Sequence, residues 1–191
     1  KDELVGRSLP RVIRHAAERH RLVMLLERTA LIDSLTDVYN RRGFELTVRS
    51  RLSAADRSNR SSMLLFIDVD GLKAINDTHG HEAGDAAIRT VATALRRSLR
   101  DSDIVGRVGG DEFAAWMDGA TPPSVQSATA RVDALLESAQ RDAEWPFAVR
   151  VTIGATPIVS GDRNVAEVLA RADQAMYAAR ADRGRQRLRA V

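Results

Sequence analysis

The chain has 191 residues and a formal net charge of +3, with 44% hydrophobic, 29% charged and 4% aromatic residues. This length and hydrophobic content are typical of one globular domain with an appended segment, and they exclude a disordered chain. The absence of cysteine excludes disulfide bonds and thiolate metal sites. The longest run of large apolar residues, 22–26, is too short to cross a membrane, so we expect no membrane contact from this part of the protein.

The first predicted element is a helix over residues 10–32, a stretch without glycine in which apolar residues approximate a heptad stripe. The stripe consists of Val12, Ala16, Val23, Leu26 and Ala30, interrupted by Arg19. Such a helix pairs with its twin in a homodimer or packs on its own domain, and the pattern leaves both open. We assign residues 1–32 to this N-terminal signalling or dimerisation helix and residues 33–191 to the main domain.

Helical and strand patterns then alternate along the chain. Apolar spacing predicts helices that begin near Phe44, Ile88, Pro122 and Val165. Strand patterns cover residues 63–69, 104–108, 112–117 and 148–158, with a polar loop expected over residues 71–85. Gly109 and Gly110 separate two of the strands and are typical of a hairpin turn. This order predicts an α/β or α+β fold with a central mixed sheet flanked by helices.

Acidic residues lie at the ends of two of these strands. Asp68 and Asp70 end an apolar strand, where alternation puts both side chains on one face of the sheet. Asp111 and Glu112 follow the hairpin glycines. If the hairpin lies beside that strand, Asp68 and Asp111 form a hard oxygen-ligand site of the kind Mg²⁺ prefers. Taken singly, each motif is more often a structural turn; together they favour metal-dependent phosphoryl or nucleotidyl chemistry.

Polar side chains crowd the predicted loop that follows the strand. They are Lys73, Asn76, Asp77, Thr78, His79, His81, Glu82 and Asp85. A carboxylate accepts hydrogen bonds from the amino and ring N–H groups of guanine, while an amide both donates and accepts. Asn and Asp in this segment therefore have the chemistry to read a purine edge, and a surface turn with a helix N-cap is the structural alternative.

Residues 109–113 read GGDEF, the signature of the diguanylate cyclase family, and Arg107 and Val108 precede it as the family pattern expects. Three further groups of residues resemble the family's ordered motifs. They are Asp33-Ser34-Leu35-Thr36 with Asn40-Arg41-Arg42; Asp68-Val69-Asp70 with Lys73, Asn76-Asp77, Gly80-His81 and Gly84-Asp85; and Ala172-Asp173 with Ala175-Met176-Tyr177. The resemblance covers residues 33–185. It implies a GGDEF catalytic domain over residues 33–191, with a five-stranded, palm-like fold similar to class III nucleotide cyclases.

The resemblance also implies roles for individual residues. Asp68 and Asp111 would bind two Mg²⁺ or Mn²⁺ ions with help from the Val69 carbonyl, and Asn76 and Asp85 would recognise guanine with His81 nearby. The other implied substrate contacts are Gly71, Leu72, Lys73, Gly109, Gly110, Arg180 and Arg185.

The implied reaction joins two GTP molecules into cyclic di-GMP and pyrophosphate, through attack of a 3′-hydroxyl on an α-phosphate. Two metal ions would activate the hydroxyl and neutralise the leaving group, Lys73 would stabilise transition-state charge, and Asp111 or Glu112 would accept the proton. A product with two equivalent halves indicates a two-fold homodimer. We expect this activity in the bacterial cytoplasm, with any sensory or membrane-attached segment located upstream of Lys1.

Arg100 and Asp103 form an Arg-x-x-Asp sequence, separated from Gly109 by five residues. In the resembled family this register marks a product-binding inhibitory site. Arginine grips phosphate and stacks on guanine, and aspartate accepts from the N–H edge of the base. An ordinary helix-terminal arginine is the structural alternative. We expect cyclic di-GMP to be both product and inhibitor.

The sequence departs from the family pattern at four places. Asp37 stands where the opening motif usually has glycine, and Gly71 replaces a common aromatic residue. Arg180 takes the place of a lysine that commonly contacts phosphate, which keeps the charge but changes the geometry. The closing Gly184-Arg185 comes one residue late, so the triphosphate contact from this tail is the least supported of the set.

Two other functions fit parts of the sequence. One is a non-catalytic regulatory module that binds GTP or cyclic di-GMP; the combination of Asp68, Lys73, Asp111 and Glu112 argues against it, because a sensor needs no such metal constellation. The other is a nucleic-acid-binding protein, suggested by the arginine-rich stretches 7–28 and 180–189. It would bind in a strongly salt-dependent way, but it gives no reason for acids at a hairpin tip. The low aromatic content also disfavours base stacking, so we expect no nucleic-acid partner.

Overall fold

The computed structural model describes the backbone of residues 30–58 and 61–189, and the side chains of residues 30–53 and 61–181. Of the predicted N-terminal helix, only residues 30–32 fall within this part, and residues 30 and 31 are helical. The assignment of residues 1–32 to signalling or dimerisation otherwise lies outside the described residues. Among the described helices, none combines the length and apolarity needed to span a bilayer.

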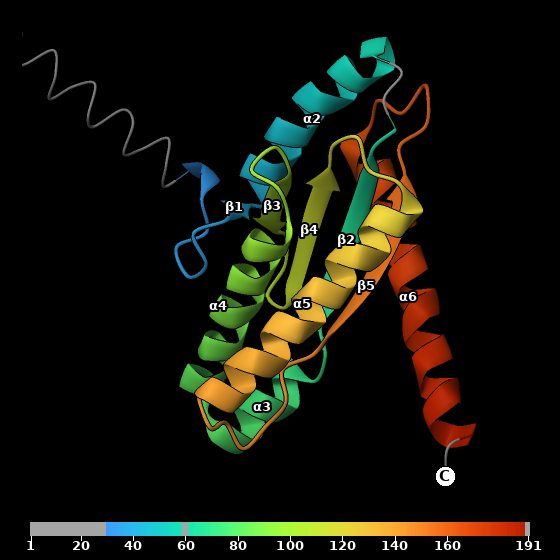
Figure 1. Ribbon diagram of the computed structural model, residues 1–191. Helices are drawn as coiled ribbons and strands as arrows, with labels where there is room; N and C mark the ends of the chain where they lie inside the picture. The colour runs from blue at the N-terminus through green and yellow to red at the C-terminus, as the bar shows by residue number, and fades with distance from the viewer. Residues whose placement is uncertain (1–29, 59–60, 190–191) are drawn as a thin grey trace, which may run out of the picture.

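A five-stranded sheet with the order β1-β3-β4-β2-β5 forms the centre of the molecule (Figure 1). The strands are β1 (Tyr39–Asn40), β2 (Met63–Val69), β3 (Ile104–Arg107), β4 (Glu112–Met117) and β5 (Val151–Pro157). β1 pairs parallel to β3, and all other pairs are antiparallel. The predicted mixed five-stranded sheet and the hairpin are therefore confirmed.

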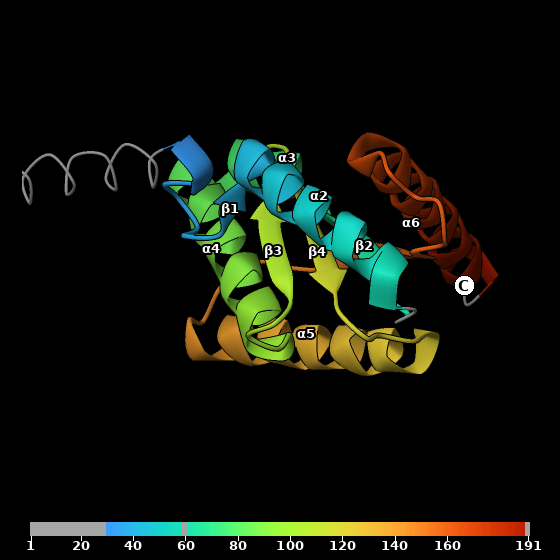
Figure 2. The same cartoon turned by 90° about the horizontal axis from the view of Figure 1, so that it is seen from above.

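Helices cover both faces of this sheet (Figure 2). They are α2 (Arg41–Ser58), α3 (Leu72–His79), α4 (His81–Ser98), α5 (Pro122–Asp142) and α6 (Val165–Arg189). α2 and α6 share one hydrophobic cluster with the sheet, and α3, α4 and α5 share the other. The result is the expected α+β architecture, with the sheet as the middle of three layers.

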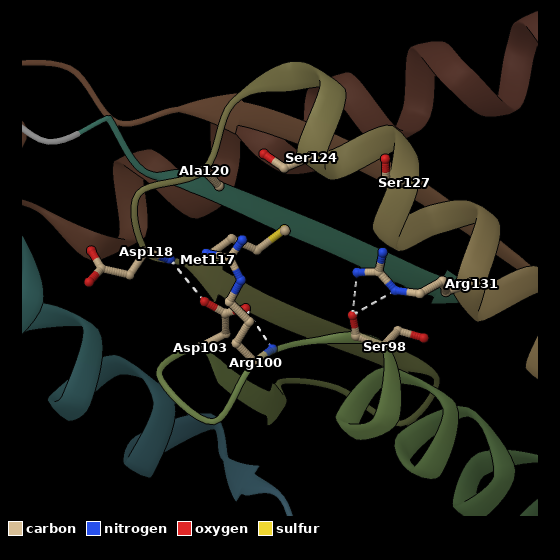
Figure 3. A pocket seen from close by; sticks show the side chains of 9 residues that line it. All are labelled: Ser98, Arg100, Asp103, Met117, Asp118, Ala120, Ser124, Ser127 and Arg131. Atoms are coloured by element: carbon tan, nitrogen blue, oxygen red, sulfur yellow. Dashed lines mark hydrogen bonds between the residues drawn. The ribbon is translucent and has the colours of Figure 1, made fainter.

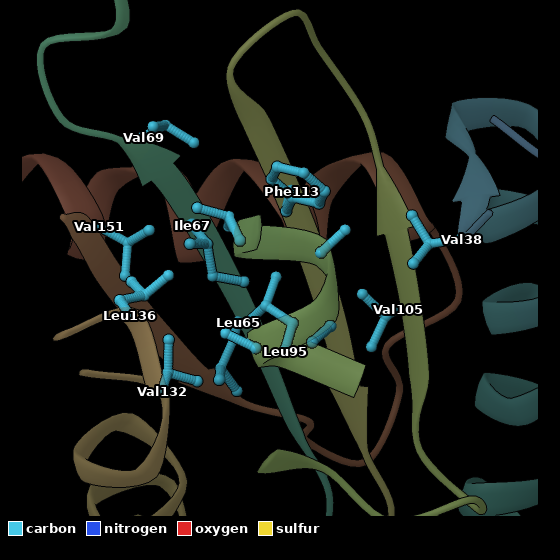
Figure 4. Close-up of a cluster of buried hydrophobic side chains, with 14 of the residues drawn as sticks. Val38, Leu65, Ile67, Val69, Leu95, Val105, Phe113, Val132, Leu136 and Val151 are labelled. Carbon is cyan, nitrogen blue, oxygen red and sulfur yellow. The ribbon is translucent and has the colours of Figure 1, made fainter. Parts of the chain in front are cut away.

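Strand alternation in β2 decides which layer each side chain enters. Leu65, Ile67 and Val69 pack with Leu95 of α4 and Leu136 of α5, as Figure 4 shows. The intervening Leu64 and Phe66 lie in the cluster under α2 and α6. Because side chains alternate along a strand, the next residue of that second set, Asp68, faces α6.

Residues 72–79 form the helix α3 and α4 begins at His81, so the predicted loop over residues 71–85 is wrong except at Gly71 and Gly80. Leu72 and Ile75 are the only buried residues of α3, and they pack one turn of the helix against the core. Gly71 precedes the helix with φ 70° and Gly80 follows it with φ 86°, both left-handed values that favour glycine. Two large apolar residues in eight give too weak a period to predict a helix. The same holds for β1, whose two residues are too few for a strand pattern.

Candidate active site

The sheet brings two acidic residues into direct opposition. Asp68 near the end of β2 pairs with Glu112 at the start of β4, and both side chains point to the α6 face. The Val69 N–H donates a hydrogen bond of 3.0 Å to the Asp111 carbonyl, which places the hairpin tip beside the end of β2. Like charges directly opposite on neighbouring strands are destabilising, so a structural role alone does not account for this pair.

The electrostatics of the pair show that its negative charge is only partly compensated. Burial raises the pKa of Asp68 above its ordinary value; Arg180 opposes this rise, and the charges of Asp111 and Asp70 add to it. Burial also raises the pKa of Glu112, with further contributions from Asp111, Asp68 and Asp173. Carboxyl groups in this state attract a cation.

The donor chemistry at this strand end fits a divalent metal ion. Asp68 and Asp111 supply carboxylate oxygens, and Val69, whose N–H bonds to the Asp111 carbonyl, supplies a backbone carbonyl. Among the described side chains, no group of three or more acidic or histidine residues is arranged to hold a metal ion. Mg²⁺ binds through one or two carboxylates plus substrate phosphates, so two carboxylates suit an ion that arrives with a nucleotide.

Arg180 reaches this site from α6. Its Nη2 atom pairs with Asp68 Oδ1 and lies 3.4 Å from Asp70 Oδ1. Thr152 of β5 donates a hydrogen bond of 2.7 Å to the same Asp70 oxygen and so fixes that carboxylate. The expected Arg180 thus lies at the carboxylates of Asp68 and Asp70, whereas the side chain of Arg185 lies outside the described residues.

Arg107 holds the turn that carries the GGDEF signature. Its guanidinium donates to the Gly110 carbonyl at 2.7 Å and pairs with Asp33 at 3.3 Å. Asp33 in turn accepts from the Thr36 N–H at 3.0 Å, closing the turn in which Asp37 adopts a φ of 56°. The family's usual glycine at position 37 would adopt that left-handed conformation without strain. Arg107 therefore links the chain entry at Asp33 to the hairpin tip.

The predicted guanine-reading residues lie where α3 meets α4. The Asn76 side chain lies against Gly84, where a Cβ atom would overlap its Oδ1 atom. Asp85, the next residue, is half-exposed and lies 3.8 Å from Arg89. His81 and Lys73 are exposed. The structure thus brings Asn76 and Asp85 to one helix crossing, while His81 and Lys73 make no contact that marks a role.

A second site occupies the opposite end of the sheet. Arg100 and Asp103 line a pocket of about 230 Å³ together with Arg131 of α5, as Figure 3 shows. Asp103 accepts hydrogen bonds from the N–H groups of Arg100 (2.9 Å) and Asp118 (3.1 Å). Arg131 donates to the Ser98 carbonyl at 2.6 Å. Asp118 follows the end of β4, whereas Glu112 begins it, so the strand separates this pocket from the carboxylates.

Sequence reasoning missed Arg131 at this pocket. It is an arginine within a long, otherwise ordinary helix, and no local motif distinguishes it. The packing of α5 against α4 brings it to Ser98. Only a predicted α4–α5 contact would have drawn attention to it.

Comparison with known proteins gave consistent matches. The family model described as "Diguanylate cyclase, GGDEF domain" matches residues 30–186. The chain is 38% identical to the probable diguanylate cyclase DgcC of Escherichia coli K12 over 165 aligned residues. The aligned stretch covers 86% of this chain and 43% of DgcC. It thus spans less than half the length of that relative.

Two solved structures resemble the fold. The coiled coil and GGDEF domain of DgcB from Caulobacter crescentus, in complex with c-di-GMP, has a TM-score of 0.74 at 26% identity and covers 90% of this chain and 93% of that one. The diguanylate cyclase SiaD of Pseudomonas aeruginosa, in complex with its activator SiaC, has a TM-score of 0.73 at 27% identity, covering 92% of this chain and 69% of that one.

Proposed function

Because the chain belongs to the GGDEF-domain family of diguanylate cyclases, we propose that it condenses two GTP molecules into cyclic di-GMP and pyrophosphate. The observation that carries the proposal is the meeting of Asp68, Asp111 and Glu112 at one strand end. This acidic site lies beside an arginine that can bind phosphate. GTP is a cytoplasmic nucleotide, so we place the activity in the cytoplasm.

In the proposed site, Asp68, Asp111 and the Val69 carbonyl hold two Mg²⁺ or Mn²⁺ ions. When bound, such ions lower the pKa of a hydroxyl group and neutralise charge on the departing pyrophosphate. Lys73 and Arg180 bind triphosphate oxygens, with the backbone at Gly71, Leu72, Gly109 and Gly110 close to the nucleotide. Asn76 and Asp85 select guanine at the α3–α4 crossing.

The bond changes in this proposal balance within the two nucleotides. The 3′-oxygen of one GTP bonds to the α-phosphorus of the other, the α–β phosphoanhydride bond breaks, and pyrophosphate leaves. The hydroxyl proton passes to a carboxylate. Asp111 and Glu112 are the candidate acceptors, and Glu112 lies opposite Asp68 on the neighbouring strand. A second, identical event closes the ring, so we propose a homodimer with one GTP per chain.

We further propose that the pocket of Arg100, Asp103 and Arg131 binds cyclic di-GMP and inhibits the enzyme. Two guanidinium groups and one carboxylate match the phosphates and guanine edge of that ligand. The same pocket favours the second candidate function, a regulatory module that binds cyclic di-GMP without making it. Turnover distinguishes the two.

Chromatography of the products of GTP and Mg²⁺ tests the proposal. Wild-type protein should form cyclic di-GMP, and Asp111→Ala should keep its circular dichroism spectrum but lose turnover. Asp142→Asn, which changes an exposed acid at the end of α5, is the matched control and should retain activity. Binding of cyclic di-GMP without any product would support the regulatory module instead, and an active Asp111→Ala variant would refute the metal assignment.

A further inference from the structure

The position of α6 over the acidic strand end is fixed by close backbone packing. A Cβ atom at Gly154 of β5 would lie 2.4 Å from Met176 Cα and 2.5 Å from the Ala172 carbonyl oxygen of α6. Helix and strand therefore touch without an intervening side chain. Arg180 lies one helical turn beyond Met176 and on the same face, so the contact at Gly154 determines where its guanidinium lies.

Arg180 covers the two carboxylates that end β2. It pairs with Asp68, whose side chain is 14% exposed, while its own side chain is 43% exposed. It also lies 3.4 Å from Asp70, which Thr152 orients. A guanidinium presents several donors in a plane and so can contact both carboxylates, whereas the ammonium of a lysine is a single point of charge.

We propose that Arg180 is an internal counter-cation that occupies the Asp68–Asp70 pair until a metal-bound triphosphate replaces it. This inference rests on the proposed function. A divalent ion and a guanidinium compete for the same Asp68 oxygen, so an ion that binds without nucleotide must displace Arg180 from that oxygen and leave the guanidinium only its longer contact with Asp70. A triphosphate gives the displaced guanidinium new partners. Metal and nucleotide therefore strengthen each other's binding, and by linkage the factor is the same in both directions.

A titration with Mn²⁺, followed by electron paramagnetic resonance, tests this coupling without turnover. Arg180→Gln should bind Mn²⁺ in the absence of nucleotide about fivefold or more tightly than wild type. A GTP analogue with a methylene group between the α- and β-phosphorus should tighten Mn²⁺ binding strongly in wild type and much less in the variant. Arg180→Lys should lie between the two, because it keeps the charge without the two-carboxylate contact.

Arg97→Gln is the matched control, since it removes the same charge from the exposed end of α4, far from Asp68. It should leave both Mn²⁺ affinities unchanged. If Arg180→Gln increases the Mn²⁺ affinity by the same factor with and without the analogue, the inference is overturned, because loss of a nearby positive charge alone would explain that result. An Mn²⁺ affinity that Arg180→Gln leaves unchanged in both conditions would also overturn it. If neither wild type nor variant binds Mn²⁺ even with the analogue, the proposed metal site itself fails.

Discussion

Asp68 and Glu112 lie directly opposite each other on β2 and β4, where two like charges destabilise the sheet. Replacing Glu112 with glutamine should raise the melting temperature of the metal-free protein at pH 7. The reason is that burial and three neighbouring carboxylates make the charged form of Glu112 unfavourable. Because the side chain is partly exposed, solvent screening limits the gain to about 1 kcal/mol or less, which would raise the melting temperature of a domain this size by no more than about 2–4 °C. Differential scanning calorimetry with a chelator measures it.

The pH dependence of this gain provides its control. Because the pKa of Glu112 is raised on folding, the native state binds more protons than the unfolded state between the ordinary value of 4.5 and the raised one. Wild-type stability therefore improves, relative to the variant, as the pH falls through that interval. The difference between the two proteins should shrink toward pH 4.5. A difference that stays constant down to that pH would contradict the assigned cause.

Single residues of the acidic site could be predicted from the sequence, because strand alternation and the hairpin turn place them. Asp68, Asp111 and Glu112 follow from those two local rules. The Arg180 contact does not, because it depends on how closely α6 approaches β5 at Gly154. Arg131 depends in the same way on the packing of α5 against α4. Residues whose position is set by an interhelix or helix–sheet contact lie beyond local pattern reasoning.

At the scale of elements, α6 packs so closely on β5 at Gly154 that adding one methyl group there would disturb the contact. Gly154→Ala should destabilise the domain by about 1–3 kcal/mol, the range for overpacking a close contact. Its Cβ would meet backbone atoms of Met176 and Ala172, which cannot rotate away. Urea denaturation measures the loss, and Gly154→Val should lose more. Unchanged stability would mean that α6 shifts freely, and Mn²⁺ affinity should then change through Arg180.

At the α3–α4 crossing, in contrast, we expect a glycine substitution to change nucleotide binding rather than stability. Alanine is a better helix former than glycine by about 1 kcal/mol, yet at Gly84 of α4 its Cβ would overlap the Asn76 side chain. Gly84→Ala should therefore leave stability nearly unchanged while weakening binding of a GTP analogue, because the displaced amide no longer faces the base. Isothermal titration calorimetry measures the affinity.

A double-mutant cycle separates this effect from a general disturbance of the helix. In the Asn76→Ala background, Gly84→Ala should cost no further nucleotide affinity, since its effect acts through that amide. Additive losses would show that Gly84 contacts the nucleotide independently. Among the longer elements, β2 was predictable from its apolar run and α5 from its helical period, whereas α3 was not, because tertiary contacts hold its two buried residues.

At the scale of the whole molecule, the two proposed sites lie at opposite ends of the same strand. The carboxylates lie where β4 begins, and the pocket of Arg100, Asp103 and Arg131 lies where it ends. A ligand in that pocket cannot cover the acidic site of its own chain. The proposed inhibition would therefore act at a distance, either through the fold of one chain or through the pairing of two chains in the proposed homodimer.

This geometry predicts separate effects on inhibition and on chemistry. Arg100→Ala and Arg131→Ala should each raise the concentration of cyclic di-GMP needed for half-inhibition by about tenfold or more, since each removes a charged hydrogen bond to phosphate worth about 1.5–3 kcal/mol. Initial rates at low product should stay at the wild-type level, because both arginines lie at the far end of the sheet. Arg97 is exposed on α4 and lies outside the pocket lining, so Arg97→Ala should change neither quantity.

Loss of inhibition in Arg100→Ala alone would remove Arg131 from the site. A fall in the initial rate of both variants would mean that the pocket supports catalysis directly. An effect confined to inhibition in both variants would mean that the product acts at a distance, across the length of β4.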